Sequence, residues 1–162
     1  VKRINEDARL EEEVDLVDGY IYIMNVRFSN EIHFSKEIDE SLLGIKVPSM
    51  ILQPIVENAV NYGIRDVEWE GKVKLSVYHS DGEILISIKD NGVGMLQSTI
   101  EKIKSGEIRD ENLEKDSTGI GLRNVISRLR IYYNKEDVVS IISEGKNKGT
   151  EVIIHIPVEE NI

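Results

Sequence analysis

Two pairs of alternating strands constrain the fold of this chain more than any other feature. Residues 71–79, "GKVKLSVYH", alternate apolar with polar side chains, and residues 83–90, "EILISIKD", do the same after a short turn. The apolar positions of this pair are Val73, Leu75, Val77, Ile84, Ile86 and Ile88. A period of two around a tight turn predicts a β-hairpin that buries one face. "VVSIIS" and "TEVIIHIP" predict a second hairpin, and "EIHFSKEI" at 31–38 predicts a further half-buried strand.

Three other segments carry apolar residues at helical spacing. Residues 48–62 and 121–133 each have one apolar face, with Pro48 suited to a helix start and Pro54 expected to make the first turn irregular. The third segment has apolar steps of four and three, at Leu10, Val14, Val17, Ile21, Met24 and Phe28. This stripe fits either a helix that covers its own domain or one strand of a coiled coil.

The order of helices and hairpins predicts the fold class. We expect an α/β two-layer sandwich, in which a mixed, mostly antiparallel sheet has helices packed on one face. The 162 residues carry a formal net charge of −10, which argues against a nucleic-acid partner because phosphate backbones attract clustered Lys and Arg. Without cysteine, disulfides, thiolate metal sites and cysteine nucleophiles are excluded. No apolar run reaches the roughly 18 residues of a membrane helix, so we expect no membrane contact by this segment.

The stretch "DNGVGM" holds the most informative polar residue. By alternation from the isoleucines before it, Asp90 falls on the buried face, where a carboxylate is costly unless it is bonded. An adenine amino group would be a suitable donor, although a strand-end Asp that begins a tight turn is the plainer interpretation. Gly92 and Gly94 allow positive φ and a close approach of a flat ligand to the backbone.

Two further segments carry candidate ligand-binding groups. "TGIGL" opens an amphipathic helix, so the free amides of residues 119–122 predict an anion site suited to phosphate. Asn58 lies one turn from Asn61 and Tyr62 on a predicted helix, and an amide oxygen is a hard ligand that suits Mg²⁺. A solvated polar face is the alternative. Residues 95–117 are charged and weakly periodic, which predicts a long loop that is either a lid or disordered.

Taken together, the motifs resemble the ATP-binding domain of sensor histidine kinases, and more narrowly the LytS/YesM type. The resemblance rests on "VPSMILQPIVENAVNYGI", "DNGVGM", "TGIGLRNVISRL" and "GTEVIIHIP" in this order, and "LEEEVDLVDGYIYIMNVRF" is similar to the segment before the nucleotide domain of that type. It implies a Bergerat-type ATP-binding fold. Residues 1–30 would be the helical tail of the dimerisation and phosphoacceptor region, and residues 31–162 the ATP-binding catalytic domain with a lid at 95–117.

The resemblance also implies which residues hold ATP and Mg²⁺. Asn58 would coordinate the Mg²⁺ that bridges the phosphates. Asp90 would accept a hydrogen bond from the adenine amino group, supported by the Thr150 hydroxyl and an ordered water. Gly92 and Gly94 would let the loop pass against the base.

On the phosphate side, Gly119 and Gly121 would form the loop, and Tyr62 would lie by the base or the ribose. The remaining expected pocket residues are Asn61, Met95, Thr118 and Leu122.

The sequence departs from the family pattern in two places. Asn61 stands where such kinases often carry a lysine that reaches the phosphates, and Arg65, Arg123 or a lid lysine are possible replacements. The phosphoacceptor histidine and its Pro-His-Phe-type pattern are missing, because His33, His79 and His155 lie in or at the ends of predicted strands. We expect these three histidines to be structural. The chain starts at Val1, and we expect a fragment of a longer protein that cannot autophosphorylate alone.

The expected function is transfer of the ATP γ-phosphoryl group to a histidine outside this fragment, with Glu57 placed to orient or deprotonate that histidine. The alternatives are a non-catalytic nucleotide-binding module, a serine-directed kinase, or an ATPase of the same superfamily. The ATPase clamps use a glutamate four residues before the metal-binding Asn, where this chain has Pro54. Expected partners are the protein's own phosphoacceptor helical domain, in a homodimer, and a cognate response regulator. The expected location is the cytoplasmic end of a membrane-anchored bacterial sensor.

Overall fold

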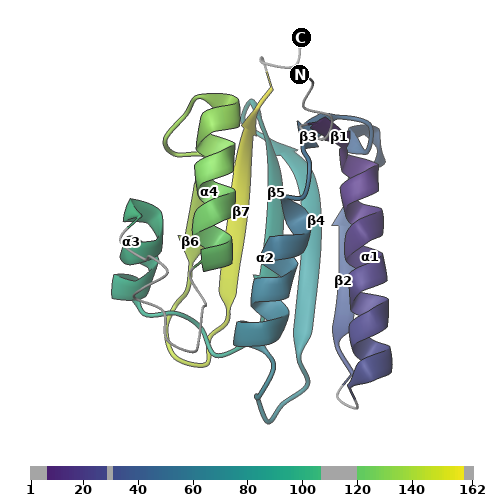
Figure 1. Ribbon diagram of the computed structural model, residues 1–162, viewed down its shortest axis with the longest axis vertical. Helices are drawn as coiled ribbons and strands as arrows, with labels where there is room; N and C mark the ends of the chain where they lie inside the picture. The colour runs from purple at the N-terminus through teal and green to yellow at the C-terminus, as the bar shows by residue number, and fades with distance from the viewer. Residues whose placement is uncertain (1–6, 29–30, 107–119, 159–162) are drawn as a thin grey trace.

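The computed structural model describes residues 7–28, 31–106 and 120–158. Within these ranges the strands are β1 (Asp7–Arg9), β2 (His33–Ile38), β3 (Lys46–Pro48), β4 (Lys72–Ser80), β5 (Glu83–Asp90), β6 (Val139–Ile142) and β7 (Thr150–Pro157). The helices are α1 (Leu10–Arg27), α2 (Leu52–Asn58), α3 (Gln97–Ser105) and α4 (Ile120–Tyr133), with a 3₁₀ turn η1 (Glu40–Leu42) and a π turn η2 (Ala59–Gly63). The described helices lie on one face of the main sheet (Figure 1).

The main sheet has the strand order β2-β4-β5-β7-β6. Strands β4, β5, β7 and β6 pair antiparallel, and β2 pairs parallel with β4 at the edge. Strands β1 and β3 form a separate two-stranded pair. Both predicted hairpins are present, and Asp81 and Gly82 turn the first one with φ angles of 47° and 80°. The predicted two-layer sandwich with a mixed, mostly antiparallel sheet is therefore confirmed.

The alternating residues of the strands and the stripes of the helices form one hydrophobic core. The six predicted apolar positions of the first hairpin are each at most 2% exposed. Helix α4 buries the side chains that its period predicts, namely Leu122, Val125, Ile126 and Leu129. Burial of this kind stabilises a fold by about 25 cal/mol per Å² of apolar surface. Because the strand and helix periods determine which side chains are buried, they largely determine the architecture.

Helix α1 packs against α2 and joins the same core. Leu10, Val14, Val17 and Ile21 of the predicted stripe are buried, whereas Phe28 at its end is 40% exposed. The described part of α1 thus covers its own domain, which is the first of the two alternatives for this stripe. No helix among the described residues has the length and apolar character needed to cross a bilayer.

Two expectations about the helices were wrong in detail. Pro48 ends β3 rather than starting a helix, and α2 begins at Leu52. Pro54 is therefore the third residue of α2, where its missing N–H costs no helical hydrogen bond. Part of the predicted loop 95–117 is helix α3, because Ile100 and Ile103 fall one turn apart and are buried. The rest of that predicted lid, from residue 107, lies outside the described residues.

The register of the central strands fixes which end of the sheet holds Asp90. Asp90 pairs with Thr150 at one end, and Glu83 pairs with Pro157 at the other. Strand β1 lies near the Pro157 end, as Figure 1 shows, and the Tyr132 hydroxyl at the end of α4 donates to Asp7 at 2.6 Å. The first and last described strands of the chain therefore meet at the end of the sheet that is far from Asp90.

Candidate functional site

Asp90 is the buried acid at the end of β5, as alternation predicts. Its side chain is 8% exposed, and Oδ1 accepts a hydrogen bond from the Gly92 amide at 2.8 Å. Burial raises the pKa of Asp90 to about 6, although the N–H groups of Gly92 and Thr150 act in the opposite direction. The position therefore presents a partly desolvated carboxyl group that lacks a cationic partner among the described residues.

Glycines surround Asp90 because neighbouring atoms leave no room for a side chain. A Cβ on Gly92 would lie 2.0 Å from the Gly63 carbonyl oxygen, and one on Gly149 would lie 2.2 Å from the Asp90 carbonyl oxygen. A Cβ on Gly63 would lie 3.0 Å from the Asp90 carboxyl group. Three backbone segments thus meet at Asp90 at a spacing that only glycine permits.

A cavity of about 280 Å³ opens beside Asp90. It brings together six of the predicted site residues: Asn58, Tyr62, Asp90, Gly94, Met95 and Thr150. Its other lining residues are Gly63, Val93, Leu96 and Thr99. Gly94 has φ +81°, and the Met95 amide donates to Ser143 Oγ at 3.0 Å, which holds this wall on the β6–β7 connection. The cavity combines an apolar wall with an acid, an amide and hydroxyl groups, as small-molecule sites do.

The "ENAVNYG" stretch ends in the π turn η2, and its residues face two different cavities. The Ile64 amide donates to the Ala59 carbonyl five residues earlier, at 3.0 Å. Tyr62 lines the cavity together with Asn58, from which it lies four residues away on the same side of the helix. Asn61 lines a different cavity, together with Arg65. The sequence analysis placed both Asn61 and Tyr62 one turn from Asn58, and only Tyr62 shares its cavity.

Glu57 does not line the cavity. Its carboxylate accepts a hydrogen bond from Gln53 Nε2 at 2.9 Å, one turn earlier on α2. The structure thus places the predicted general base on another side of α2 from Asn58, where it is half-buried.

The predicted phosphate side is only partly described. Thr118 and Gly119 lie outside the described residues. Gly121 is in the first turn of α4, and a Cβ there would meet nothing within 4 Å. Leu122 is 1% exposed and belongs to the core, so its side chain is not a pocket wall. The Leu122 backbone is all that this residue can offer to a ligand.

Gly63, Gly149, Leu96 and Thr99 are site residues that the sequence analysis missed. Gly63 ends the "ENAVNYG" stretch, so the need for a glycine against Asp90 could have been inferred once the two motifs were placed together. Thr99 and Leu96 come from a segment whose helix was not predicted.

His155 and His33 contact other side chains of the domain, and the structural role expected of all three histidines stays a prediction. His155 Nε2 lies 2.8 Å from Ser140 Oγ, and its Nδ1 lies 3.1 Å from a Glu83 oxygen, across three strands of the sheet. His33 pairs with Glu70. None of them lines the cavity beside Asp90.

Comparisons with known proteins identify the family of the chain. Residues 47–160 match the family described as histidine kinase-, DNA gyrase B-, and HSP90-like ATPase. Sensor histidine kinase YesM of Bacillus subtilis is 28% identical over 153 residues, which is 94% of this chain and 24% of that protein. Sensor protein LytS of Bacillus cereus is 30% identical over 148 residues, which is 91% of this chain and 24% of that protein. The chain thus spans about a quarter of the length of these relatives.

Solved structures show the same fold. The nucleotide-free catalytic domain of histidine kinase ThkA aligns with a TM-score of 0.62 at 19% identity, covering 94% of this chain and 97% of that one. The mycobacterial sensor histidine kinase MprB aligns with a TM-score of 0.61 at 16% identity, with the same coverage. From the matched residues, the fold and the sensor kinase relatives, the chain belongs to the family of histidine kinase-, DNA gyrase B- and HSP90-like ATPases, as an ATP-binding catalytic domain of the sensor histidine kinase type.

Proposed function

We propose that this domain binds Mg²⁺–ATP in the cavity beside Asp90 and that the whole protein passes the γ-phosphoryl group to a histidine outside residues 1–162. The observation that carries the proposal is the buried carboxyl group of Asp90 at the floor of a glycine-walled cavity. An ionised Asp90 would accept a hydrogen bond from the adenine amino group, and Thr150, its partner across the β5–β7 pair, would support that contact.

The close-packed glycines supply the shape of the adenine subsite. Gly94 and Gly63 line the cavity without side chains, so a flat base can lie against backbone atoms. Tyr62 is 38% exposed at the same wall, where its ring would contact the base or the ribose. Met95 and Leu96 add apolar surface. This combination favours an aromatic ligand with one exocyclic donor.

Asn58 fits a Mg²⁺ ion that is held mainly by the phosphates. It brings one neutral amide oxygen to the cavity wall, and Mg²⁺ commonly takes one or two protein oxygens together with phosphate oxygens and waters. The ion would neutralise phosphate charge during transfer. We further propose that the backbone of residues 118–122 contacts the phosphates and that residues 95–117 close over the nucleotide, with α3 as the described part of that lid.

The usual cationic contact to the phosphates has no replacement on η2. Asn61 and Arg65 both line a different cavity from the proposed nucleotide site. The remaining described candidates are Lys102 and Lys104 of the proposed lid and Arg123 in the first turn of α4. The Arg123 Nε is buried without a hydrogen-bond partner among the described residues.

We also propose that the partners are those of a two-component sensor. The acceptor histidine would lie on a helical domain that precedes the ATP-binding domain and dimerises, with residues 1–30 as its last part. A response regulator would receive the phosphoryl group, and the whole protein would be membrane-anchored with this domain in the cytoplasm. The sensor kinase relatives support this proposal.

The proposed pocket predicts how two substitutions change ATP binding. In Asp90→Asn, a neutral amide replaces the carboxylate that would accept the hydrogen bond from adenine. ATP affinity should therefore fall more than tenfold, with or without Mg²⁺. Asn58→Ala should weaken ATP binding only when Mg²⁺ is present. Isothermal titration calorimetry of the unmodified domain and both variants measures this directly. Failure of the unmodified domain to bind ATP would reject the proposal.

Glu57 has a separate prediction, because the structure places it outside the cavity. If it orients or deprotonates the acceptor histidine, Glu57→Gln in the full-length protein should slow autophosphorylation about tenfold or more while ATP affinity stays the same. Incorporation of labelled phosphate, together with calorimetry, separates the two effects. Gln53→Ala, which removes only the hydrogen-bond partner of Glu57, is the matched control. An unchanged rate in Glu57→Gln would remove the general-base role.

A further inference from the structure

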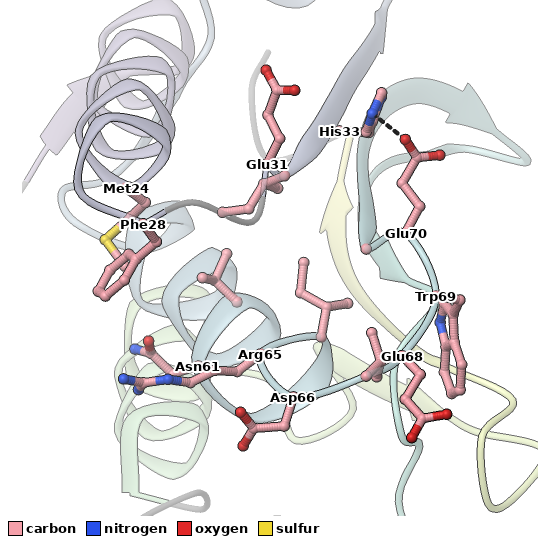
Figure 2. Close-up of a pocket in the computed structure, with 15 residues that line it drawn as sticks. Met24, Phe28, Glu31, His33, Asn61, Arg65, Asp66, Glu68, Trp69 and Glu70 are labelled. Atoms are coloured by element: carbon pink, nitrogen blue, oxygen red, sulfur yellow. Dashed lines mark ion pairs between the residues drawn. The ribbon is translucent and has the colours of Figure 1, made fainter.

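A second and larger cavity is lined by Val60 and Asn61 of η2, whereas Tyr62 and Gly63 of η2 line the cavity beside Asp90, which we call the nucleotide cavity after its proposed function. Figure 2 shows the residues of the second cavity. It measures about 580 Å³ and is walled by the end of α1, the start of β2, η2 and residues 64–71. Ile32, Val60, Ile64 and Val67 give it an apolar floor. We call it the outer cavity. None of the family motifs in the sequence requires it.

The rim of the outer cavity is acidic. Its lining has four carboxylates, at Glu31, Asp66, Glu68 and Glu70, against a single arginine. His33 pairs with Glu70, as Figure 2 shows. Glu31, Asp66 and Glu68 form no ion pair with any other residue in the described ranges, so three carboxylates stand around the opening without a cation.

Two aromatic residues, Phe28 and Trp69, line the cavity on opposite sides (Figure 2). Phe28 already has two guanidinium groups of its own chain near its ring, with Arg27 at 5.4 Å and Arg65 at 5.8 Å from the centroid. Trp69, on the other wall, is 41% exposed, and no described cation lies over its ring. An indole is the strongest of the aromatic partners for a cation. The site thus lacks a positively charged group beside Trp69.

We propose that the outer cavity binds an arginine-bearing polypeptide segment of a partner. The guanidinium would lie over the Trp69 ring and be neutralised by Asp66 and Glu68, while the aliphatic stem packs on the apolar floor. Charge complementarity favours this occupant, since an acidic or neutral segment would leave Asp66 and Glu68 without a cationic partner.

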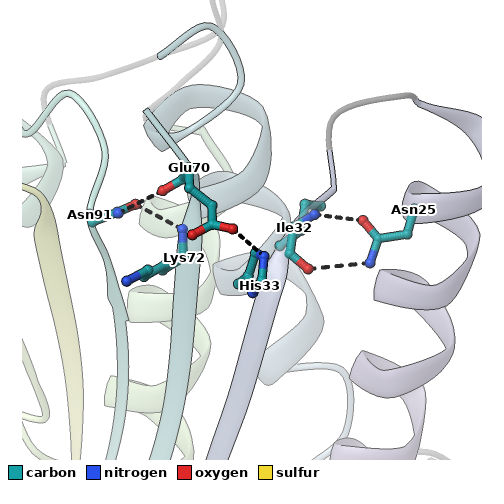
Figure 3. Close-up of polar contacts among 6 residues, drawn as sticks. All are labelled: Asn25, Ile32, His33, Glu70, Lys72 and Asn91. Atoms are coloured by element: carbon teal, nitrogen blue, oxygen red, sulfur yellow. Dashed lines mark hydrogen bonds and ion pairs between the residues drawn. The ribbon is translucent and has the colours of Figure 1, made fainter. Parts of the chain in front are cut away.

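The outer cavity is joined to the nucleotide cavity through Asn91. The Trp69 indole N–H donates to the Asn91 carbonyl at 2.7 Å. The Asn91 side chain accepts from the Lys72 amide at 2.8 Å and donates to the Glu70 carbonyl at 2.9 Å (Figure 3). Asn91 follows Asp90 directly. A cation that repositions Trp69 therefore acts on the residue next to Asp90, and we expect the two sites to be coupled. This part of the inference rests on the proposed function.

Trp69 is the single tryptophan of the chain, so its indole N–H gives one resonance that reports on the cavity without a label. The probe is Nα-acetyl-arginine amide, and Nα-acetyl-citrulline amide is its neutral counterpart of nearly the same shape. The arginine probe should shift the indole resonance saturably, and the citrulline probe should not. Glu68→Gln should weaken the arginine probe roughly twofold to fivefold. Glu136→Gln, a 91% exposed acid beyond α4, should leave it unchanged.

Two results of this titration would overturn the cation site: equal shifts with both probes, or no saturable shift with either. The titration needs no nucleotide, so it tests the cation site even if ATP fails to bind. Coupling is tested by repeating it with ATP present, where the probe affinity should change by about fivefold. Trp69→Phe keeps an aromatic ring but loses the indole N–H that reaches Asn91. In this variant, backbone amide shifts should show that the probe binds, and ATP should leave the probe affinity unchanged. In the unmodified domain, ATP binding with an unchanged probe affinity would overturn the coupling.

Discussion

At the scale of single residues, the burial of Asp90 lowers the stability of the fold at neutral pH. The folded pKa of about 6 lies above the ordinary value of 3.8, so between these values the folded state binds more protons than the unfolded state. Stability should therefore fall as the pH rises from about 4 to about 6 and stay lower above that range. A cation or a ligand donor at the carboxylate would offset this cost.

Asp90→Asn should stabilise the nucleotide-free domain at pH 7, although it weakens ATP binding. The expected gain is about 1–3 kcal/mol, because a neutral amide keeps the bond from the Gly92 N–H without a buried charge. Urea unfolding at pH 4.5 and pH 7 measures it, and the fall in stability between those pH values should largely disappear. Asp137→Asn, at an exposed position, serves as the control. A loss of stability at pH 7 would contradict the account.

The burial of Asp90 could be predicted from sequence because strand alternation is a local rule. The contact between Asp90 and Gly63 is not local, because it depends on how closely η2 approaches β5, and it can be inferred only once the two motifs are placed together. The same holds for Gly149, which no local rule distinguishes from an ordinary turn glycine. Gly94, with its positive φ, belonged to a motif and was found.

At the scale of elements, the N-terminus of α2 is held by side chains from two other helices. The Glu13 carboxylate of α1 accepts hydrogen bonds from the amides of Met50, Ile51 and Leu52, at 2.8, 2.9 and 3.2 Å. Arg128 of α4 donates to the Met50 carbonyl at 3.0 Å and to the Ser49 carbonyl. Glu13 is 2% exposed and supplies the cap that α2 lacks in its own sequence.

Glu13→Gln should destabilise the domain by about 1–3 kcal/mol, because an amide replaces a charged acceptor and turns an N–H donor toward other donors. Chemical denaturation followed by circular dichroism gives the free energy of unfolding. Asp15→Asn changes an exposed acid on the same helix and is the matched control. Equal stability of the two variants would show that the three hydrogen bonds contribute nothing.

Gly19→Ala should have the opposite effect. Gly19 lies in the middle of α1, and a Cβ there would meet nothing within 4 Å. The alanine should add about 1 kcal/mol of stability through helix propensity alone. Gly92→Ala is the contrasting variant, since its Cβ would meet the Gly63 carbonyl oxygen at 2.0 Å, and it should destabilise the fold. A rise in the thermal midpoint for Gly19→Ala and a fall for Gly92→Ala check both statements.

The π turn shows why element boundaries were harder to predict than element types. Apolar periodicity identifies a helix near residues 48–62, yet it is too coarse to detect one extra residue between Ala59 and Gly63. Tyr62 faces the cavity beside Asp90, whereas Asn61 faces the outer cavity. Helix α3 was missed for a related reason, because only two buried isoleucines mark it among charged residues.

At the scale of the whole molecule, α1 belongs to the core although it precedes the matched family region. The match covers residues 47–160, whereas Leu10, Val14 and Val17 of α1 are buried in the same cluster as the sheet. Together with Glu13, this makes α1 part of what holds α2 and hence Asn58 in place. The sequence stripe of α1 predicted a helix, but only the fold shows what it covers.

The strand register also makes this domain a convenient building block for engineering. Strand β1 and the end of β7 lie at the end of the sheet away from Asp90. A host protein or a solid support attached through both ends would therefore leave the nucleotide cavity open to solution. Since the chain has no cysteine, single thiols introduced near those ends would give site-specific attachment without competing labels.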